Sequence, residues 1–207
     1  MELNPNQIYH IYNRGNNKQQ IFFEEENYKY FLEKTKKYLV PYCDILSFSL
    51  MPNHFHFMIH ANEKTNLPFR KTTSLPNRKK KPKIKMTFFS RGLQQLLSSY
   101  TKGINKRFNR TGSLFQQNTK SKRTSSDIHN EDYSVWCFIY IHNNPKAAGL
   151  VNQPEDYEFS SCQDFIGKRA DSICNIQLAK ELLSLDENEI FIKKGIEIPP
   201  DVLKRIF

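Results

Sequence analysis

The first forty residues carry two successive hydrophobic patterns. Residues 7–14 place β-branched and aromatic side chains among polar ones and stop at Gly15-Asn16-Asn17, which predicts a strand that ends in a turn. Residues 24–40 instead place apolar side chains at helical spacing, with acids in the first turn and lysines near the end, where they suit the helix dipole. This second pattern predicts a helix that ends at Pro41.

Two strand-like segments follow closely on one another. Residues 44–50 and 54–61 are rich in β-formers and are joined by Met51-Pro52-Asn53. A connection this short favours antiparallel neighbours. Residues 62–85, by contrast, contain three prolines and a lysine-rich cluster without any periodicity, which is typical of an inserted linker.

The next part of the chain is mainly helical in pattern. Residues 87–108 predict a second helix with a basic C-terminal tip, and residues 132–144 predict a third, aromatic-rich helix. The third helix ends either at Pro145 or at Gly149, one turn later. Between the two helices, residues 111–123 are rich in Gln and Lys and predict a basic loop or an irregular hairpin that would add a fourth strand.

The order strand, helix, strand, strand, helix predicts an α+β fold, a ferredoxin-like sandwich with an antiparallel sheet. We place one domain at residues 1–167, with the lysine-rich insertion at 62–85, and a tail of unassigned role at 168–207. Weakly helical patterns occupy this tail at residues 175–185 and 187–194. Because the fold hosts many functions, only a site can separate them.

Charge narrows the classes of partner. The 207 residues include 31 Lys and Arg against 21 Asp and Glu, a net charge of +10. Seventeen of these cations lie between residues 61 and 130, where the only acids are Glu63 and Asp127. A segment so polarised attracts polyanions. Nucleic acid is favoured over an anionic membrane, because the chain shows no amphipathic anchor helix and no lipidation motif.

Composition excludes several other classes. The longest uncharged apolar stretch, residues 45–59, is interrupted by Pro52, Asn53 and two histidines, so it does not predict a membrane span. The first residues lack the apolar core of a signal peptide, and the four cysteines lack the spacing of zinc knuckles. We therefore expect a cytoplasmic protein whose cysteines are free thiols.

The first candidate chemistry lies in the strand at residues 54–61. Alternation along it gives an apolar face with Phe55, Phe57 and Ile59 and a second face with His54, His56 and His60. The imidazoles of His54 and His56 project from adjacent pleats and can reach one divalent ion, whereas His60 lies at the strand end without a ligand role. The residues alone leave a second interpretation open, in which both histidines belong to a half-exposed strand that binds no metal.

The second candidate chemistry lies in the third helix. Tyr140 and Asn144 are four residues apart and so share one face of that helix. A deprotonated tyrosine is a competent nucleophile toward phosphorus, and an Asn carbonyl oxygen can complete a metal site begun by two imidazoles. The alternative is that Tyr140 is a core residue, which is the usual place of a helical aromatic beside Trp136 and Phe138.

Together these segments resemble one family, the REP-associated tyrosine transposases and related single-strand insertion-sequence transposases of the HUH nuclease superfamily. The resemblance covers roughly residues 5 to 167. The matching segments, in order, are residues 9–15, 50–56, 112–116, 140–145, 148–151 and 157–161. The most specific part is the Met-Pro-Asn-His-x-His run joined to Tyr-x-His-x-Asn-Pro.

The resemblance implies an enzyme that cuts single-stranded DNA near a short hairpin and rejoins strands through a 5′-phosphotyrosine link. It makes Tyr140 the nucleophile, and it makes His54, His56 and Asn144 the ligands of a Mg²⁺ or Mn²⁺ ion. A helper base is left open among His10, His142 and a metal-bound water. Aromatic side chains of the first strand would stack on unpaired bases. Cations suited to contact phosphates are Arg14, Lys102, Lys106, Arg107, Lys120, Lys122 and Arg123.

Two other functions compete with this one. A non-catalytic module that binds structured DNA or RNA on the same fold would explain the charge equally well. A metal-dependent hydrolase that uses water as its nucleophile would leave no covalent adduct. The oligomeric state is open between a monomer and a homodimer.

Overall fold

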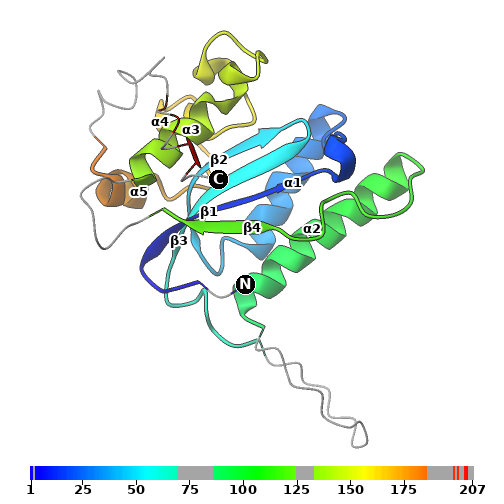
Figure 1. The fold of residues 1–207 in the computed structure, drawn as a ribbon, viewed down its shortest axis with the longest axis horizontal. Helices are drawn as coiled ribbons and strands as arrows, with labels where there is room; N and C mark the ends of the chain where they lie inside the picture. Colours follow the sequence, from blue (N-terminus) through cyan, green and yellow to red (C-terminus); the bar gives the residue numbers. More distant parts are fainter. Residues whose placement is uncertain are drawn as a thin grey trace, which may run out of the picture.

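The computed structural model describes residues 1, 3–69, 86–124, 133–185, 198, 200, 203 and 204. These residues contain a four-stranded antiparallel sheet in the order β2-β3-β1-β4 (Figure 1). The strands are β1 (Gln7–Arg14), β2 (Asp44–Met51), β3 (His54–Ala61) and β4 (Lys120–Arg123). The helices are α1 (Glu25–Tyr38), α2 (Phe88–Arg107), α3 (Tyr133–Ala147), α4 (Cys162–Phe165) and α5 (Ile176–Leu183), with short 3-10 turns η1 (Asn16–Lys18) and η2 (Pro154–Asp156).

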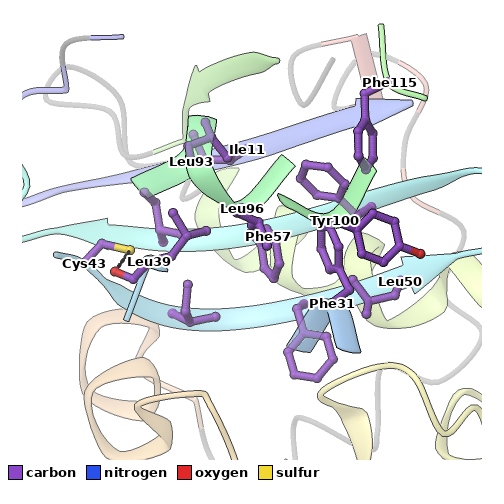
Figure 2. Packing of buried hydrophobic residues seen from close by; sticks show 14 of the residues in the cluster. Ile11, Phe31, Leu39, Cys43, Leu50, Phe57, Leu93, Leu96, Tyr100 and Phe115 are labelled. Carbon is purple, nitrogen blue, oxygen red and sulfur yellow. Dashed lines mark hydrogen bonds between the residues drawn. The ribbon is translucent and has the colours of Figure 1, made fainter. Parts of the chain in front are cut away.

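Helices α1 and α2 cover one face of the sheet (Figure 1). Their apolar stripes meet Ile11 of β1 and Phe57 of β3, and Figure 2 shows Phe31 and Tyr100 packed into the same cluster. The Tyr100 ring is fully buried, and its hydroxyl donates to the carbonyl of Ile21 over 2.6 Å. Burial of each large side chain contributes about 1.5–3 kcal/mol, so this layer anchors the sheet.

Helices α3, α4 and α5 cover the opposite face. Phe138 and Ile141 of α3 pack with Met58 of β3, and Ala179 of α5 belongs to the same cluster. Helix α5 lies beyond residue 167, so this part of the predicted tail packs directly on the sheet. The arrangement of strand, helix, strand, strand, helix and strand confirms the α+β sandwich expected from the sequence.

The end of α3 decides between the two stop signals in the sequence. The helix continues through Pro145 and ends at Ala147. Gly149 then adopts a left-handed conformation with φ of 69°. The amide of Gly149 donates to the carbonyl of Lys146, and the amide of Leu150 donates to the carbonyl of Pro145. These two bonds form a Schellman motif, in which glycine is favoured because it has no Cβ. Gly149 is therefore the stop signal, and Asn144 remains within the helix.

Other sequence predictions differ from the structure only in detail. Residues 120–123 form the fourth strand that the sequence suggested, and the short helix α4 is an element that the sequence patterns did not predict. The lysine-rich residues 70–85 and the predicted helix at 187–194 lie outside the described residues. In the part of the chain that is described, no helix is both long and apolar enough to cross a membrane.

Candidate active site

The pairing of β1 with β3 sets up the candidate site. Tyr12 lies opposite His56, and Arg14 lies opposite His54, so these four side chains project from the same face of the sheet. It is the face that α3 covers. The site therefore lies between two central strands and one helix, at the end of the sheet where β3 begins.

The two candidate metal ligands lie side by side on β3. The ring centroids of His54 and His56 are 4.8 Å apart, with the rings edge to face. His56 is buried, and His54 is partly buried. His60 lies at the far end of the strand, where its Nδ1 is 3.5 Å from Oδ2 of Asp44. His60 therefore lies apart from the pair formed by His54 and His56.

Burial keeps both imidazoles neutral. It lowers the pKa of His54 to about 4, helped by the positive charge of Arg14. It also lowers the pKa of His56 well below its usual value, and the neighbouring His10, His54 and Arg14 act in the same direction. A neutral imidazole retains a lone pair on one ring nitrogen, which is the state that binds metal ions.

Helix α3 brings the candidate nucleophile to these histidines. The Tyr140 ring meets His56 edge to face, with 5.5 Å between ring centroids, and lies 6.3 Å from the ring of His10. The amide nitrogen of Asn144 donates to the phenol oxygen of Tyr140 over 2.9 Å. The structure therefore brings together the four residues that sequence analysis selected for catalysis and metal binding.

Tyr140 is held as a neutral phenol in this environment. Burial raises the pKa of Tyr140, and Cys137 and Tyr12 add to the effect. The hydrogen bond from Asn144 and the charge of Arg14 act in the opposite direction and lower that pKa. The groups that would stabilise a phenolate are therefore already in place around the oxygen.

The two histidines considered as helper bases lie in different surroundings. Nε2 of His142 is 2.7 Å from the hydroxyl oxygen of Ser161, and the ring packs edge to face against Phe138 and Phe165. His142 is thus part of the core beneath α3. His10 lies on the site face of β1, with its Nε2 2.8 Å from Nδ1 of His56. The structure favours His10 over His142 for any role at the site.

The predicted DNA-binding cations fall into two groups. Lys120 pairs with Tyr12 and Lys122 with His10 across the β1–β4 ladder, so both lysines lie on the site face, as does Arg14. Arg123 pairs with Tyr9, which projects to the other face. Lys102, Lys106 and Arg107 belong to α2, which covers that other face.

The cations of α2 contact residues outside the candidate site. Arg107 forms an ion pair with Glu24. Lys102 lines an open groove of about 720 Å³ between α2 and residues 112–119, whose other polar lining is uncharged amides and hydroxyls. The seven cations therefore do not form one surface, because Arg14, Lys120 and Lys122 lie on the site face and the others do not.

The structure changes the view of two sets of residues, the aromatic side chains of β1 and the residue next to His54. Of the first-strand aromatics expected to stack on bases, Tyr9 is buried in the cluster beneath α1 and α2, whereas Tyr12 lies partly exposed on the site face. Asn53 was missed, although its Oδ1 lies 2.6 Å from Nδ1 of His54. Alternation along β1 places His10, Tyr12 and Arg14 on one face, and this pattern was the sequence signal for which residues of β1 line the site.

The donor set fits a divalent metal ion. Within residues 3–69, 86–124 and 133–185, no three His, Cys, Asp or Glu side chains cluster in a way that could hold a metal. The donors that the sequence suggested for such a site are the two imidazoles of β3 and the carboxamide oxygen of Asn144, whose amide nitrogen is engaged by Tyr140. A carboxamide oxygen suits Mg²⁺ and Mn²⁺, and the imidazole nitrogens suit first-row transition metals, so the mixed set fits a divalent ion.

Comparison with known proteins gives a likeness in structure. No protein-family model matches the chain, and no curated protein matches its sequence. Among solved structures, the chain is similar to a REP-associated tyrosine transposase bound to a REP hairpin. The TM-score is 0.54, the sequences are 12% identical, and the match covers 84% of this chain and 92% of the other. The chain therefore shares its fold with that protein. This likeness in fold agrees with the resemblance noted in the sequence.

Proposed function

We propose that the chain is a metal-dependent single-stranded DNA endonuclease and strand transferase that acts near DNA hairpins through a 5′-phosphotyrosine intermediate. The observation that carries the proposal is the meeting of Tyr140, Asn144, His54 and His56 at one end of the sheet. A pure binding module has no need for a tyrosine hydrogen-bonded to an amide beside two neutral imidazoles. The hairpin in the similar structure supports DNA of this kind as substrate.

The chemistry assigned to Tyr140 is an in-line displacement at phosphorus. Its phenol oxygen forms a bond to the scissile phosphorus as the bond to the 3′-oxygen breaks, which leaves a 5′-phosphotyrosine and a free 3′-hydroxyl. Attack by a 3′-hydroxyl on that link reverses the exchange and releases Tyr140. The energy of the broken bond is kept in the phosphotyrosine, so rejoining needs no nucleotide cofactor.

The residues around Tyr140 have separate tasks. Asn144 and Arg14 favour the phenolate that attack requires. His54, His56 and the Asn144 carbonyl would hold Mg²⁺ or Mn²⁺, which supplies positive charge to a non-bridging phosphate oxygen. Arg14, Lys120 and Lys122 would bind backbone phosphates on the same face of the sheet.

The test is a search for the covalent adduct. The chain is incubated with a pool of single-stranded oligonucleotides that contain hairpins, with Mn²⁺ or Mg²⁺ and with EDTA as control, and is then analysed on denaturing gels. We expect an adduct that needs the metal and that mass spectrometry, after nuclease digestion, locates at Tyr140. Cleavage without an adduct would indicate a hydrolase, and binding without cleavage would indicate a binding module; either result contradicts the proposal.

A further inference from the structure

The two candidate metal ligands are each held at the same ring nitrogen. Nδ1 of His54 is 2.6 Å from Oδ1 of Asn53, and Nδ1 of His56 is 2.8 Å from Nε2 of His10. Each neighbour constrains both the orientation of the ring and the position of its proton. A neutral imidazole that donates from Nδ1 carries its lone pair on Nε2, and one that donates from Nε2 carries its lone pair on Nδ1.

For His54, the chemistry of the partner decides the proton's position. The amide nitrogen of Asn53 donates to the carbonyl of Lys18 over 3.2 Å, so the atom of Asn53 that faces His54 is its oxygen. A carbonyl oxygen only accepts, and Nδ1 of His54 must therefore carry the hydrogen. The lone pair of His54 lies on Nε2, where it can bind a metal ion.

For His56, the partner is a second imidazole, and either nitrogen could donate. If His10 donated to Nδ1, neutral His56 would carry its own hydrogen on Nε2 and would have no lone pair there. If His56 donates, its lone pair lies on Nε2, as in His54. Only the second arrangement gives two adjacent rings that present equivalent nitrogens.

His10 is well placed to fix this arrangement. It is fully buried in β1, between β3 and β4, and its ring stacks on Tyr12 with 4.7 Å between centroids. The contact with His56 is a side-chain bond between adjacent strands whose register is set by the sheet. A rigid acceptor behind a metal-binding imidazole is a common way to set its tautomer and orientation.

We propose that His10 is a positioning residue for the metal site: it accepts the Nδ1 hydrogen of His56 and so holds the metal-binding lone pair of His56 on Nε2. The proposal rests on the proposed function, because it concerns the same metal site. His10 then touches neither metal nor DNA and acts only through His56. The hydrogen bond from Nδ1 of His54 to Asn53 fixes the same tautomer in His54, so both ligands carry their hydrogen on Nδ1.

Two substitutions separate an acceptor from simple filling of space. His10→Gln places an amide oxygen close to the position of Nε2 and keeps an acceptor for His56. His10→Leu keeps a comparable volume but has no acceptor. His142→Leu is the matched control, because it removes another buried histidine that also has a polar partner, Ser161, away from the site.

The first measurement is nitrogen NMR of the histidine rings in the metal-free protein. We expect His56 in the wild type to carry its hydrogen on Nδ1. A wild-type His56 protonated on Nε2 would overturn the proposal. This measurement needs no variant, so it decides the matter even if His10→Leu does not fold.

The second measurement is Mn²⁺ affinity by titration with EPR detection. We expect His10→Leu to weaken binding by roughly 10–100-fold, as for other residues that support a metal ligand. His10→Gln should recover most of that loss, and His142→Leu should bind Mn²⁺ as the wild type does. Wild-type affinity in a folded His10→Leu would contradict the proposal. If the wild type binds Mn²⁺ but forms no DNA adduct, the proposed function fails while the role of His10 is still measured.

Discussion

Asn144 donates a hydrogen bond from its amide nitrogen to the phenol oxygen of Tyr140, one helical turn earlier, over 2.9 Å. The same carboxamide still has its oxygen to offer as a metal ligand. One side chain can thus lower the pKa of the nucleophile and help to hold the cation beside it. This double use depends on the helical geometry of α3, which places Tyr140 and Asn144 one turn apart on the same face.

Replacing Asn144 separates its two tasks. Asn144→Asp keeps an oxygen donor but loses the N–H that points at Tyr140, so we expect Mn²⁺ binding to be retained while adduct formation slows by at least about tenfold, from roughly 1.4 kcal/mol of lost stabilisation. Asn144→Ala should lose both. Titration of Mn²⁺ and single-turnover gels measure the two effects. Equal rates in wild type and Asn144→Asp would show that the N–H has no role.

Tyr140→Phe removes only the nucleophilic oxygen. The ring still fills its place beside His56, so oligonucleotide binding should stay within about threefold of wild type, while the covalent adduct disappears. Binding is measured by fluorescence anisotropy and the adduct on denaturing gels. Persistent adduct formation in this variant would mean that another residue is the nucleophile.

The histidines of β3 provide an internal control. His54→Ala and His56→Ala should each lose metal-dependent cleavage and weaken Mn²⁺ binding, because each removes a proposed ligand. His60→Ala should spare both, since its side chain lies beside Asp44 at the other end of the strand. If all three variants behaved alike in both assays, the histidine face would serve folding rather than metal binding.

The two groups of cations should differ in their effect on DNA binding. Replacing Lys120 and Lys122 by Gln should reduce the steepness of the log-log salt dependence by about 1.4, from roughly 0.7 for each phosphate contact on a single strand. Replacing Lys102 and Lys106, two charges on the helix across the sheet, is the matched control and should change the slope less. The reverse order would place the bound strand on the α2 face.

Buried histidines should make stability depend on pH. Burial lowers the pKa of His142 from 6.5 to about 3, so the unfolded chain takes up a proton that the folded chain does not as pH falls between these values. The free energy of unfolding should then fall by about 1.4 kcal/mol per pH unit for this one group, and the stabilisation is fully present only above the unfolded pKa. Below about pH 3 the contribution no longer changes.

His142→Gln tests this effect, because Gln does not titrate and can still bond to the hydroxyl of Ser161. Urea denaturation at several pH values between about 4 and 6.5 should give a shallower dependence on pH for the variant. Parallel pH profiles for the two proteins would mean that His142 is protonated equally readily in the folded and unfolded chains.

Local pattern alone was enough to predict most of the elements. Residues 7–14 and 54–61 were predicted as strands with the bounds that β1 and β3 have, because alternation and turn residues are properties of neighbouring positions. The same alternation put His54 and His56 on one face, and helical spacing put Tyr140 and Asn144 on another. The sequence by itself therefore determined which side chains share a face within each element.

Only the tertiary structure decided how those faces meet. The pairing of β1 with β3 places Arg14 beside His54, and no pattern within either strand contains that register. The pairing of β1 with β4 likewise separates Lys120 and Lys122 from the cations of α2, which the charge count had grouped together. His10 and His56 are 46 positions apart in the chain and share a hydrogen bond. Contacts of this kind depend on long-range strand register and on which face each helix covers, and these follow from packing of the whole core rather than from the preferences of adjacent residues.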